Sequence, residues 1–134
     1  MGGKILIVDD ETAIRTLLRS AVGAPGFTVL EADSGRRALE LAQWEGPFAL
    51  VVTDVLMPGM DGFELAEQLQ RGGHAERFLF LSGFCDAEAM AGRMGAFRNS
   101  AFLSKPFPIP DLLREVRALL EPPAAAAPKT RIAS

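Results

Sequence analysis

Five short apolar runs alternate along the chain with segments whose apolar residues recur at helical spacing. The apolar runs fall within residues 4–8, 27–32, 48–54, 77–83 and 101–105. The helical segments fall within residues 11–22, 34–46, 61–72, 86–95 and 109–120. Strands that are apolar on both sides are typical of a parallel sheet with helices on both faces and right-handed crossovers. The alternation therefore predicts an α/β domain with a doubly wound, five-stranded parallel sheet and five helices.

Capping residues support these boundaries. Ser34 and Asp61 are suited to cap the second and third helical segments, because their side-chain oxygens can accept hydrogen bonds from the first helical N–H groups. The segment 86–95 is the weakest of the five, since Gly92 and Gly95 each lower helix stability by about 1 kcal/mol relative to alanine. We expect a short or mobile helix in that segment.

The composition fits one domain in a reducing compartment. At 134 residues, 49% of them hydrophobic, the chain can bury a core without disulfides, and its single cysteine cannot form an internal one. Residues 1–120 are expected to form the domain, and the Pro- and Ala-rich residues 121–134 a disordered tail or the start of a linker. No apolar run is long enough to cross a membrane, so a cytoplasmic location is expected. The net charge of −3 and the scattered basic residues argue against nucleic acid as a direct partner.

Polar side chains stand at the carboxyl ends of four of the predicted strands. In chain order they are Asp9 and Asp10, Asp54, Ser82 and Lys105. Ligands of doubly wound sheets bind outside this edge. If the first and third strands are neighbours, about 4.8 Å apart, three carboxylates come close together. Each pair at about 5 Å then repels by roughly 3 kcal/mol at an effective dielectric constant near 20. Such a cluster must take up protons or bind a cation.

The ligand types at this edge indicate which cation. Carboxylates without a nearby cysteine or histidine favour Mg²⁺ over Ca²⁺, since an octahedral ion with few protein ligands keeps positions for water and phosphate. Lys105 would add an ammonium group and Ser82 a hydroxyl group at the same edge. Together these groups predict a site for a phosphoryl group.

Several motifs of the chain occur together, and in the same order, in a known family. They are the acid pair Asp9-Asp10, VVTDVLMPGMDG at residues 51–62, FLS at residues 80–82 and FLSKPF at residues 102–107. In these motifs the chain resembles the receiver domain of two-component response regulators, and the similarity extends over about residues 3–120. The resemblance implies the flavodoxin-like strand order 2-1-3-4-5.

The resemblance also implies a role for each residue at the edge. Asp54 would be the phosphoacceptor and a Mg²⁺ ligand, Asp10 and the backbone carbonyl of Leu56 further direct ligands, Asp9 a ligand mainly through water, Lys105 the partner of the phosphoryl oxygens, Ser82 the switch hydroxyl and Phe102 the switch aromatic. The peptide bond between Lys105 and Pro106 would be cis, which proline makes accessible.

The implied function is a phosphorylation-dependent signalling switch. A phosphohistidine of a histidine kinase or phosphotransfer protein would donate its phosphoryl group to Asp54 with Mg²⁺ as cofactor. The face formed by the fourth helix, fifth strand and fifth helix would then change shape. The protein would catalyse its own phosphorylation and dephosphorylation without being a turnover enzyme. Its other partner would be an unknown downstream protein, and the chain itself would be a monomer or a weak phosphorylation-dependent dimer.

Two positions next to the predicted site carry large apolar residues. Leu56 follows the phosphoacceptor by two residues, and Phe84 follows Ser82 by two. We hypothesise that these side chains restrict the attacking water and make self-dephosphorylation slow. Phe102 lacks the hydroxyl group of a tyrosine, so a switch at this position would act by packing alone.

Simpler interpretations remain open for single residues and for the whole chain. Asp54 or Ser82 alone could be a cap, and Phe102 an ordinary core residue. A phosphohydrolase of the haloacid dehalogenase type also uses an aspartyl nucleophile, but it needs a second aspartate where this chain has Leu56. An interaction module that never accepts phosphate would be expected to lack one of the five strand-end groups, and none is lacking. The chain could be a free-standing regulator, a phosphate sink or part of a longer protein.

Overall fold

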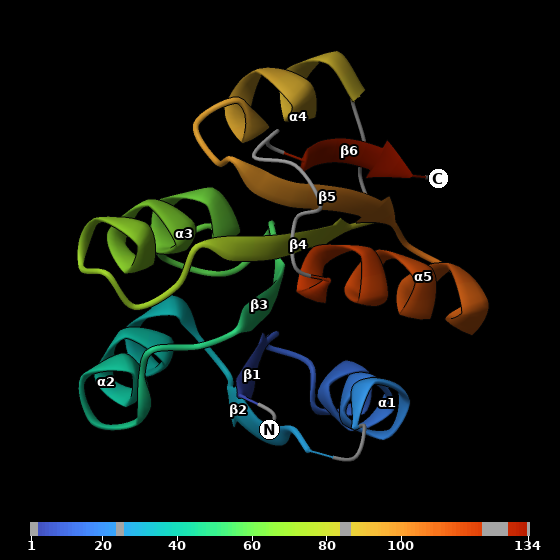
Figure 1. The fold of residues 1–134 in the computed structure, drawn as a ribbon. Helices are drawn as coiled ribbons and strands as arrows, with labels where there is room; N and C mark the ends of the chain where they lie inside the picture. The colour runs from blue at the N-terminus through green and yellow to red at the C-terminus, as the bar shows by residue number, and fades with distance from the viewer. Residues whose placement is uncertain (1–2, 24–25, 84–86, 122–128, 134) are drawn as a thin grey trace.

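Six parallel strands form one sheet in the computed structural model, which describes residues 3–23, 26–83, 87–121 and 129–133 (Figure 1). The strands are β1 (Lys4–Val8), β2 (Thr28–Ala32), β3 (Leu50–Asp54), β4 (Arg77–Ser82), β5 (Asn99–Ser104) and β6 (Lys129–Ala133). Their order across the sheet is β2-β1-β3-β4-β5-β6, and every neighbouring pair is parallel. The predicted order 2-1-3-4-5 is therefore confirmed for the first five strands.

Helices cover both faces of the sheet. Those in the described ranges are α1 (Thr12–Val22), α2 (Gly35–Glu45), α3 (Gly62–Arg71), α4 (Ala87–Met94) and α5 (Ile109–Leu120). α1 and α5 pack on one face, and α2, α3 and α4 on the other (Figure 1). The core under α2, α3 and α4 is called the α2–α3 core, and the core under α1 and α5 the α1–α5 core. In β1, Leu6 and Val8 belong to the α2–α3 core, while Ile5 and Ile7 belong to the α1–α5 core. Both faces of the central strands are buried, which explains why their sequences are continuously apolar.

Phenylalanine side chains fill much of the core beneath α3. The ring centroids of Phe63 and Phe80 are 4.4 Å apart, and those of Phe78 and Phe97 are 5.3 Å apart. Phe102 of β5 is in register with Phe80 and is buried in the same core. Full burial of such a side chain contributes about 1.5–3 kcal/mol to stability. The cluster therefore packs α3 firmly against β4, the neighbour of β3.

The ends of the helices agree with the capping prediction. The hydroxyl oxygen of Ser34 accepts a hydrogen bond from the backbone N–H of Arg37 at 3.1 Å. Asp61 and Glu64 form a reciprocal capping box at the start of α3. α4 has only 8 residues, which agrees with the expectation of a short helix. Asp86, the first residue of the predicted segment, lies outside the described residues.

The structure differs from the sequence-based expectation after residue 120. No regular structure is expected in residues 121–134, but residues 129–133 form β6, which pairs in parallel with Asn99–Leu103 of β5. Without β6, the N–H and C=O groups along this side of β5 would be an unpaired sheet edge, which readily accepts another strand. Residues 122–128 lie outside the described part of the chain, so for them the expectation stays a prediction.

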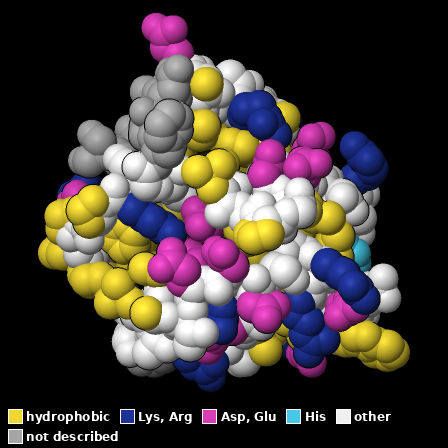
Figure 2. Space-filling view, turned by 180° about the vertical axis from the view of Figure 1, so that it is seen from behind, with side chains coloured by type: hydrophobic (Ala, Val, Ile, Leu, Met, Phe, Trp, Pro, Cys, Tyr) yellow, Lys and Arg dark blue, Asp and Glu magenta, His cyan; other side chains and the backbone are white. Residues whose placement is uncertain are grey.

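The surface carries charges of both signs. Acidic side chains gather near the middle of the face drawn in Figure 2, while Lys and Arg side chains are spread over it. Among the helices that the structure describes, none combines the length and the apolar character needed to cross a bilayer.

Candidate functional site

Three carboxylates meet where β1 and β3 end. The two strands pair in parallel, so the residues at their carboxyl ends leave the sheet at the same edge. These residues are Asp9 and Asp10 after β1 and Asp54 at the end of β3. One oxygen atom from each of the three lies within 4.8 Å of the others. Asp9 is fully buried and Asp54 is 6% exposed, whereas Asp10 is exposed. The predicted acidic cluster is thus present and open to solvent on one side.

Lys105 brings a positive charge into this cluster from the far side of β4. Its Nζ lies 3.1 Å from Oδ2 of Asp9 and 3.4 Å from Oδ2 of Asp54. Its backbone N–H donates to the carbonyl oxygen of Ser82 at 2.8 Å, which ties the end of β5 to the end of β4. The peptide bond between Lys105 and Pro106 is cis, as expected. The side chain of Lys105 is 17% exposed, so its ion pairs are only weakly screened by solvent.

Burial and charge shift the protonation of both groups. Burial raises the pKa of the Asp54 carboxyl, Lys105 partly opposes this, and the negative charge of Asp9 adds to it. For Lys105, burial by itself lowers the pKa, but the hydrogen bond to Asp9 and the charge of Asp54 outweigh burial, so the pKa is raised. One ammonium group does not balance three carboxylates, and the cluster therefore favours a further cation.

The loop after β3 is packed tightly against Asp54. The backbone of Leu56 forms a hydrogen bond to the Asp54 carboxylate, which favours its charged form. Gly59 has a φ of +82°, a backbone conformation that glycine adopts most readily. A Cβ atom on Gly62 would collide with the carbonyl oxygen of Asp54, and the N–H of Gly62 donates to the carbonyl oxygen of Val55 at 2.9 Å. The glycines of the motif therefore allow α3 to begin directly beneath the end of β3.

The donor set of the cluster fits a hard divalent cation. All three side chains offer carboxylate oxygens, which are the ligands that Mg²⁺ and Ca²⁺ prefer. Two oxygen atoms bound to one Mg²⁺ lie at most about 4.2 Å apart. The spread of 4.8 Å among the three carboxylates therefore requires only a small contraction around the ion. The open side of the cluster leaves coordination positions for water or for oxygen atoms of a substrate.

Ser82 and Phe102 lie at different distances from the edge. Ser82 ends β4, is 1% exposed and follows Leu81, which is in register with Asp54. It therefore lies on the strand next to the phosphoacceptor candidate. Phe102 is fully buried within β5, three residues before Lys105, and packs in the α2–α3 core. Phe84, which the sequence analysis also singled out, lies outside the described residues.

The structure adds residues that sequence reasoning missed. Arg15 of α1 and Glu31 of β2 form an ion pair next to the acidic edge, with 3.3 Å between Nε and Oε1. Neither residue belongs to a strand-end motif, and nothing in their sequence spacing indicates that they meet. A cavity of about 600 Å³ lies elsewhere, between the ends of α1 and α5, and its lining is mostly apolar. Cavity volume therefore does not mark the acidic site.

Comparison with known sequences gives a consistent answer. The profile described as "Response regulator receiver domain" matches residues 5–117. "Response regulator receiver protein CpdR" of Brucella abortus is 37% identical over 117 residues, which cover 87% of this chain and 96% of that protein. "Sensor kinase CckA" of the same organism is 38% identical over 118 residues, but these cover only 12% of its length. Several further relatives are matched over about half of their length.

Solved structures show the same likeness. The chemotaxis protein CheY4 of Vibrio cholerae superposes with a TM-score of 0.79 at 30% sequence identity. The match covers 90% of this chain and the whole of that chain. The family match at residues 5–117 runs from β1 to β5 and includes the residues of the acidic edge.

Proposed function

Because this chain belongs to the response regulator receiver domain family, we propose that it is a phosphorylation-dependent switch in which Asp54 accepts a phosphoryl group. The observation that carries the proposal is the convergence of three carboxylates and one ammonium group at a single edge of the sheet. This combination suits a phosphoryl group better than a plain cation store, because a store would gain nothing from a competing Lys105 ammonium.

The metal site of the proposal consists of the Asp9, Asp10 and Asp54 carboxylates and the Leu56 carbonyl. Bound Mg²⁺ would supply positive charge that neutralises the oxygen atoms of the transferred group. Buried Asp9 is already hydrogen-bonded to Lys105 and to the backbone N–H of Glu11, which suits it to act through a water molecule. Exposed Asp10 has room for direct contact with an ion.

In the proposed reaction, an oxygen atom of Asp54 attacks the phosphorus of a phosphohistidine on a partner protein. The new O–P bond forms as the P–N bond breaks, and the imidazole leaves with the electron pair of that bond and takes up a proton. Lys105 favours the ionised form of Asp54 that makes this attack, since burial raises the pKa of Asp54 and the charge of Lys105 partly opposes that rise. After transfer, Nζ of Lys105, which lies 3.4 Å from Oδ2 of Asp54, would pair with the phosphoryl oxygens. The donor class is a histidine kinase or a phosphotransfer protein.

The proposed readout begins at Ser82 and passes along β5. Ser82 ends the strand next to Asp54, and its hydroxyl would donate a hydrogen bond to the phosphoryl group. Phe102 of β5, which is buried in the α2–α3 core, would then repack. The face formed by α4, β5 and α5 would present the change to a downstream protein.

Leu56 bears on how long the phosphoryl group would persist. The residue is 59% exposed in the loop that follows Asp54. We propose that the Leu56 side chain hinders the approach of water to the phosphoryl group, so that self-dephosphorylation is slow. A phosphoryl half-life of seconds in the purified protein would contradict this part of the proposal. As an acceptor that catalyses only its own phosphorylation and dephosphorylation, the protein would not be a turnover enzyme.

Acetyl phosphate with Mg²⁺ provides a direct test of the proposed acceptor. Wild-type protein should gain the mass of one phosphoryl group, and hydroxylamine should remove it, as it does an acyl phosphate. Asp54→Asn should gain nothing. Asp33→Asn is the matched control, because Asp33 is an exposed aspartate that follows β2 and is not part of the acidic cluster. Equal labelling of Asp54→Asn, or no labelling of any variant with Mg²⁺, would reject the proposal.

A further inference from the structure

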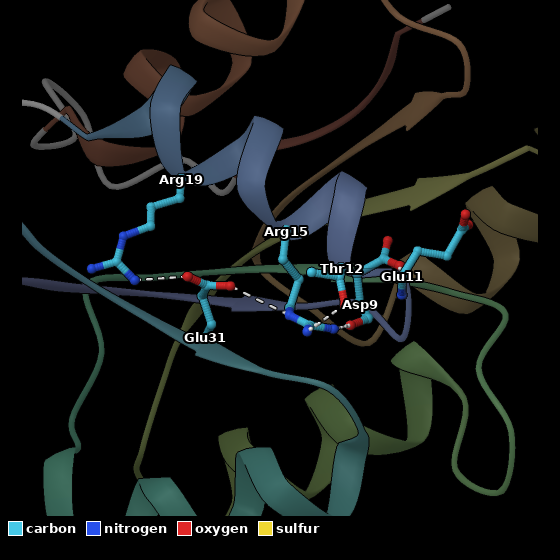
Figure 3. A network of polar contacts seen from close by, with 6 residues as sticks. All are labelled: Asp9, Glu11, Thr12, Arg15, Arg19 and Glu31. Carbon is cyan, nitrogen blue, oxygen red and sulfur yellow. Dashed lines mark hydrogen bonds and ion pairs between the residues drawn. The ribbon is translucent and has the colours of Figure 1, made fainter.

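A partly buried guanidinium group lies against the backbone of the acidic pair. Arg15 extends from α1 and its side chain is only 15% exposed. One terminal nitrogen donates to the carbonyl oxygen of Asp9 at 2.7 Å, and the other to the hydroxyl of Thr12 at 3.2 Å. Figure 3 shows Arg15 between Glu31 on one side and Asp9 on the other. The guanidinium thus contacts the main chain of the metal-site candidate and not its carboxylate.

Glu31 holds Arg15 in this orientation. It lies on β2 in register with Ile7 of β1, and Ile7 precedes Asp9 by two residues. Its Oε1 is 3.3 Å from Nε of Arg15, and its Oε2 is 2.7 Å from a terminal nitrogen of Arg19 (Figure 3). Arg19 is the more exposed arginine, at 57%. A carboxylate held from both sides has little freedom to turn, and it therefore fixes the direction of the Arg15 side chain.

With Arg15 in place, each polar atom of Asp9 has a partner. Its N–H donates to the carbonyl oxygen of Ala32 at 3.2 Å, and its carbonyl oxygen accepts from Arg15. Its Oδ1 accepts from the N–H of Glu11 at 2.9 Å, and its Oδ2 accepts from Lys105 at 3.1 Å. The Asp9 carbonyl is the first half of the peptide unit that leads into Asp10. Arg15 therefore sets the direction in which the chain delivers the exposed Asp10 carboxylate.

We propose that Arg15, oriented by Glu31, is a positioning residue that holds the Asp9-Asp10 peptide in the geometry that binds a divalent cation. The inference rests on the proposed function only in that these aspartates are taken to bind the ion. Partners of this kind, which contact the ligands and not the ion, commonly change metal affinity by about tenfold or more when they are removed.

Electrostatics alone makes the opposite prediction, which gives a sharp test. Arg15 carries a positive charge beside a cation site, so deleting it would tighten Mg²⁺ binding if only charge mattered. Replacing Glu31 by glutamine would by the same logic weaken binding, and deleting both charges would restore it. Positioning predicts that loss of the Asp9 carbonyl contact weakens binding whatever happens to the charge.

The experiment is a calorimetric Mg²⁺ titration of the full chain without a phosphodonor. Arg15→Ala should raise the Mg²⁺ Kd by about tenfold. Arg15→Lys keeps the charge and one donor and should fall between Arg15→Ala and wild type. Glu31→Gln should also weaken binding, and the double variant should bind no more weakly than Arg15→Ala, since Glu31 acts through Arg15. Arg36→Ala is the control, because Arg36 is an exposed arginine paired only within α2 in the described structure.

Phosphorylation by acetyl phosphate provides the second readout. At saturating Mg²⁺, the rate for Arg15→Ala should approach that of wild type, since a positioning role changes affinity and not the attack itself. A general loss of fold would instead lower the Mg²⁺ affinity, the phosphorylation rate at saturating Mg²⁺ and the melting temperature. In that case Arg15→Lys, measured in the same way, decides the test. Unchanged or tighter Mg²⁺ binding by Arg15→Ala overturns this inference alone. Mg²⁺ binding by wild type without phosphorylation overturns the proposed acceptor alone, and absence of binding by wild type overturns both.

Discussion

α3 and α4 cover the same face of the sheet, but they are anchored very differently. α3 begins with a capping box and buries Gly62, Phe63, Leu65, Ala66 and Leu69. α4 has 8 residues, and Met94 is the only one of residues 88–94 that is buried. α3 also touches the main chain of Asp54 through Gly62, whereas a Cβ atom on Gly92 of α4 would meet nothing within 4 Å.

This difference separates the two sides of the proposed switch. The side built by β1, β3 and α3 holds the acidic groups through backbone contacts and a dense core. The side built by β5 and α4 supplies Lys105 and a lightly packed helix. Segments with few buried contacts open at the lowest free energy, so α4 is the element best suited to change shape. The comparison indicates that, within one domain, the proposed acceptor side is rigid and the proposed readout side is adaptable.

The largest expected effect is on the rigid side. Gly62→Ala introduces a Cβ atom against the carbonyl oxygen of Asp54, which is backbone and cannot rotate away. We expect the free energy of unfolding to fall by about 1–3 kcal/mol, the range for overpacking in a core. Urea denaturation measures the change. A midpoint equal to that of wild type would show that the end of β3 is less tightly packed than the comparison requires.

A smaller effect of opposite sign is expected at Asp54 itself. Burial raises the pKa of this carboxyl above its ordinary value of 3.8, so the folded state gains stability from its protonated form at low pH. That contribution is lost as the pH rises through the raised pKa, and ionised Asp54 therefore costs stability at neutral pH. Asp54→Asn should melt a few degrees above wild type at pH 7 without divalent cations.

The pH and metal dependence provide the controls for this expectation. The advantage of Asp54→Asn should shrink as the pH is lowered toward the ordinary value of 3.8. Mg²⁺ should raise the melting temperature of wild type and narrow the difference, because a ligand stabilises the state that binds it. The exposed Asp33→Asn should show neither trend. An Asp54→Asn variant less stable than wild type at pH 7 would mean that Lys105 outweighs burial.

The smallest effect is expected on the adaptable side. Gly92→Ala adds a methyl group in open space within α4, and alanine favours helix over glycine. We expect a gain of about 0.5 kcal/mol or less in global stability, with slower hydrogen exchange confined to α4. Hydrogen exchange read by mass spectrometry measures it. A loss similar to that of Gly62→Ala would remove the contrast between the two helices.

Much of the fold and of the site could be predicted from sequence, for identifiable reasons. Continuous apolar runs such as residues 50–53 require burial on both faces, which indicates a parallel sheet. Parallel strands end at a common edge, so Asp9, Asp54 and Lys105 were expected to meet, and the distances among them are short. The roles of these residues in phosphoryl transfer remain proposals.

Other features depend on contacts that no local pattern encodes. The hydrogen bond from Arg15 to the Asp9 carbonyl oxygen depends on β2, which places Glu31 beside the Arg15 side chain of α1. The separation between Arg15 and Glu31 in the sequence does not indicate this contact. β6 exists because β5 offers unpaired backbone groups to a segment whose own composition predicts no structure. Solvent exposure is another feature that residue type does not decide: Leu56 is apolar but is 59% exposed.

The sequence by itself determined which residues alternate between strand and helix and which charges stand at the strand ends, because hydrophobic periodicity and strand-end position are properties of neighbours along the chain. Only the tertiary structure decided how those charges are held: that Asp9 is wholly buried, that Gly62 must lack a side chain, and that Arg15 contacts a carbonyl and not a carboxylate. Side-chain direction and solvent access depend on what the other elements place nearby, and that is known only once the elements have packed.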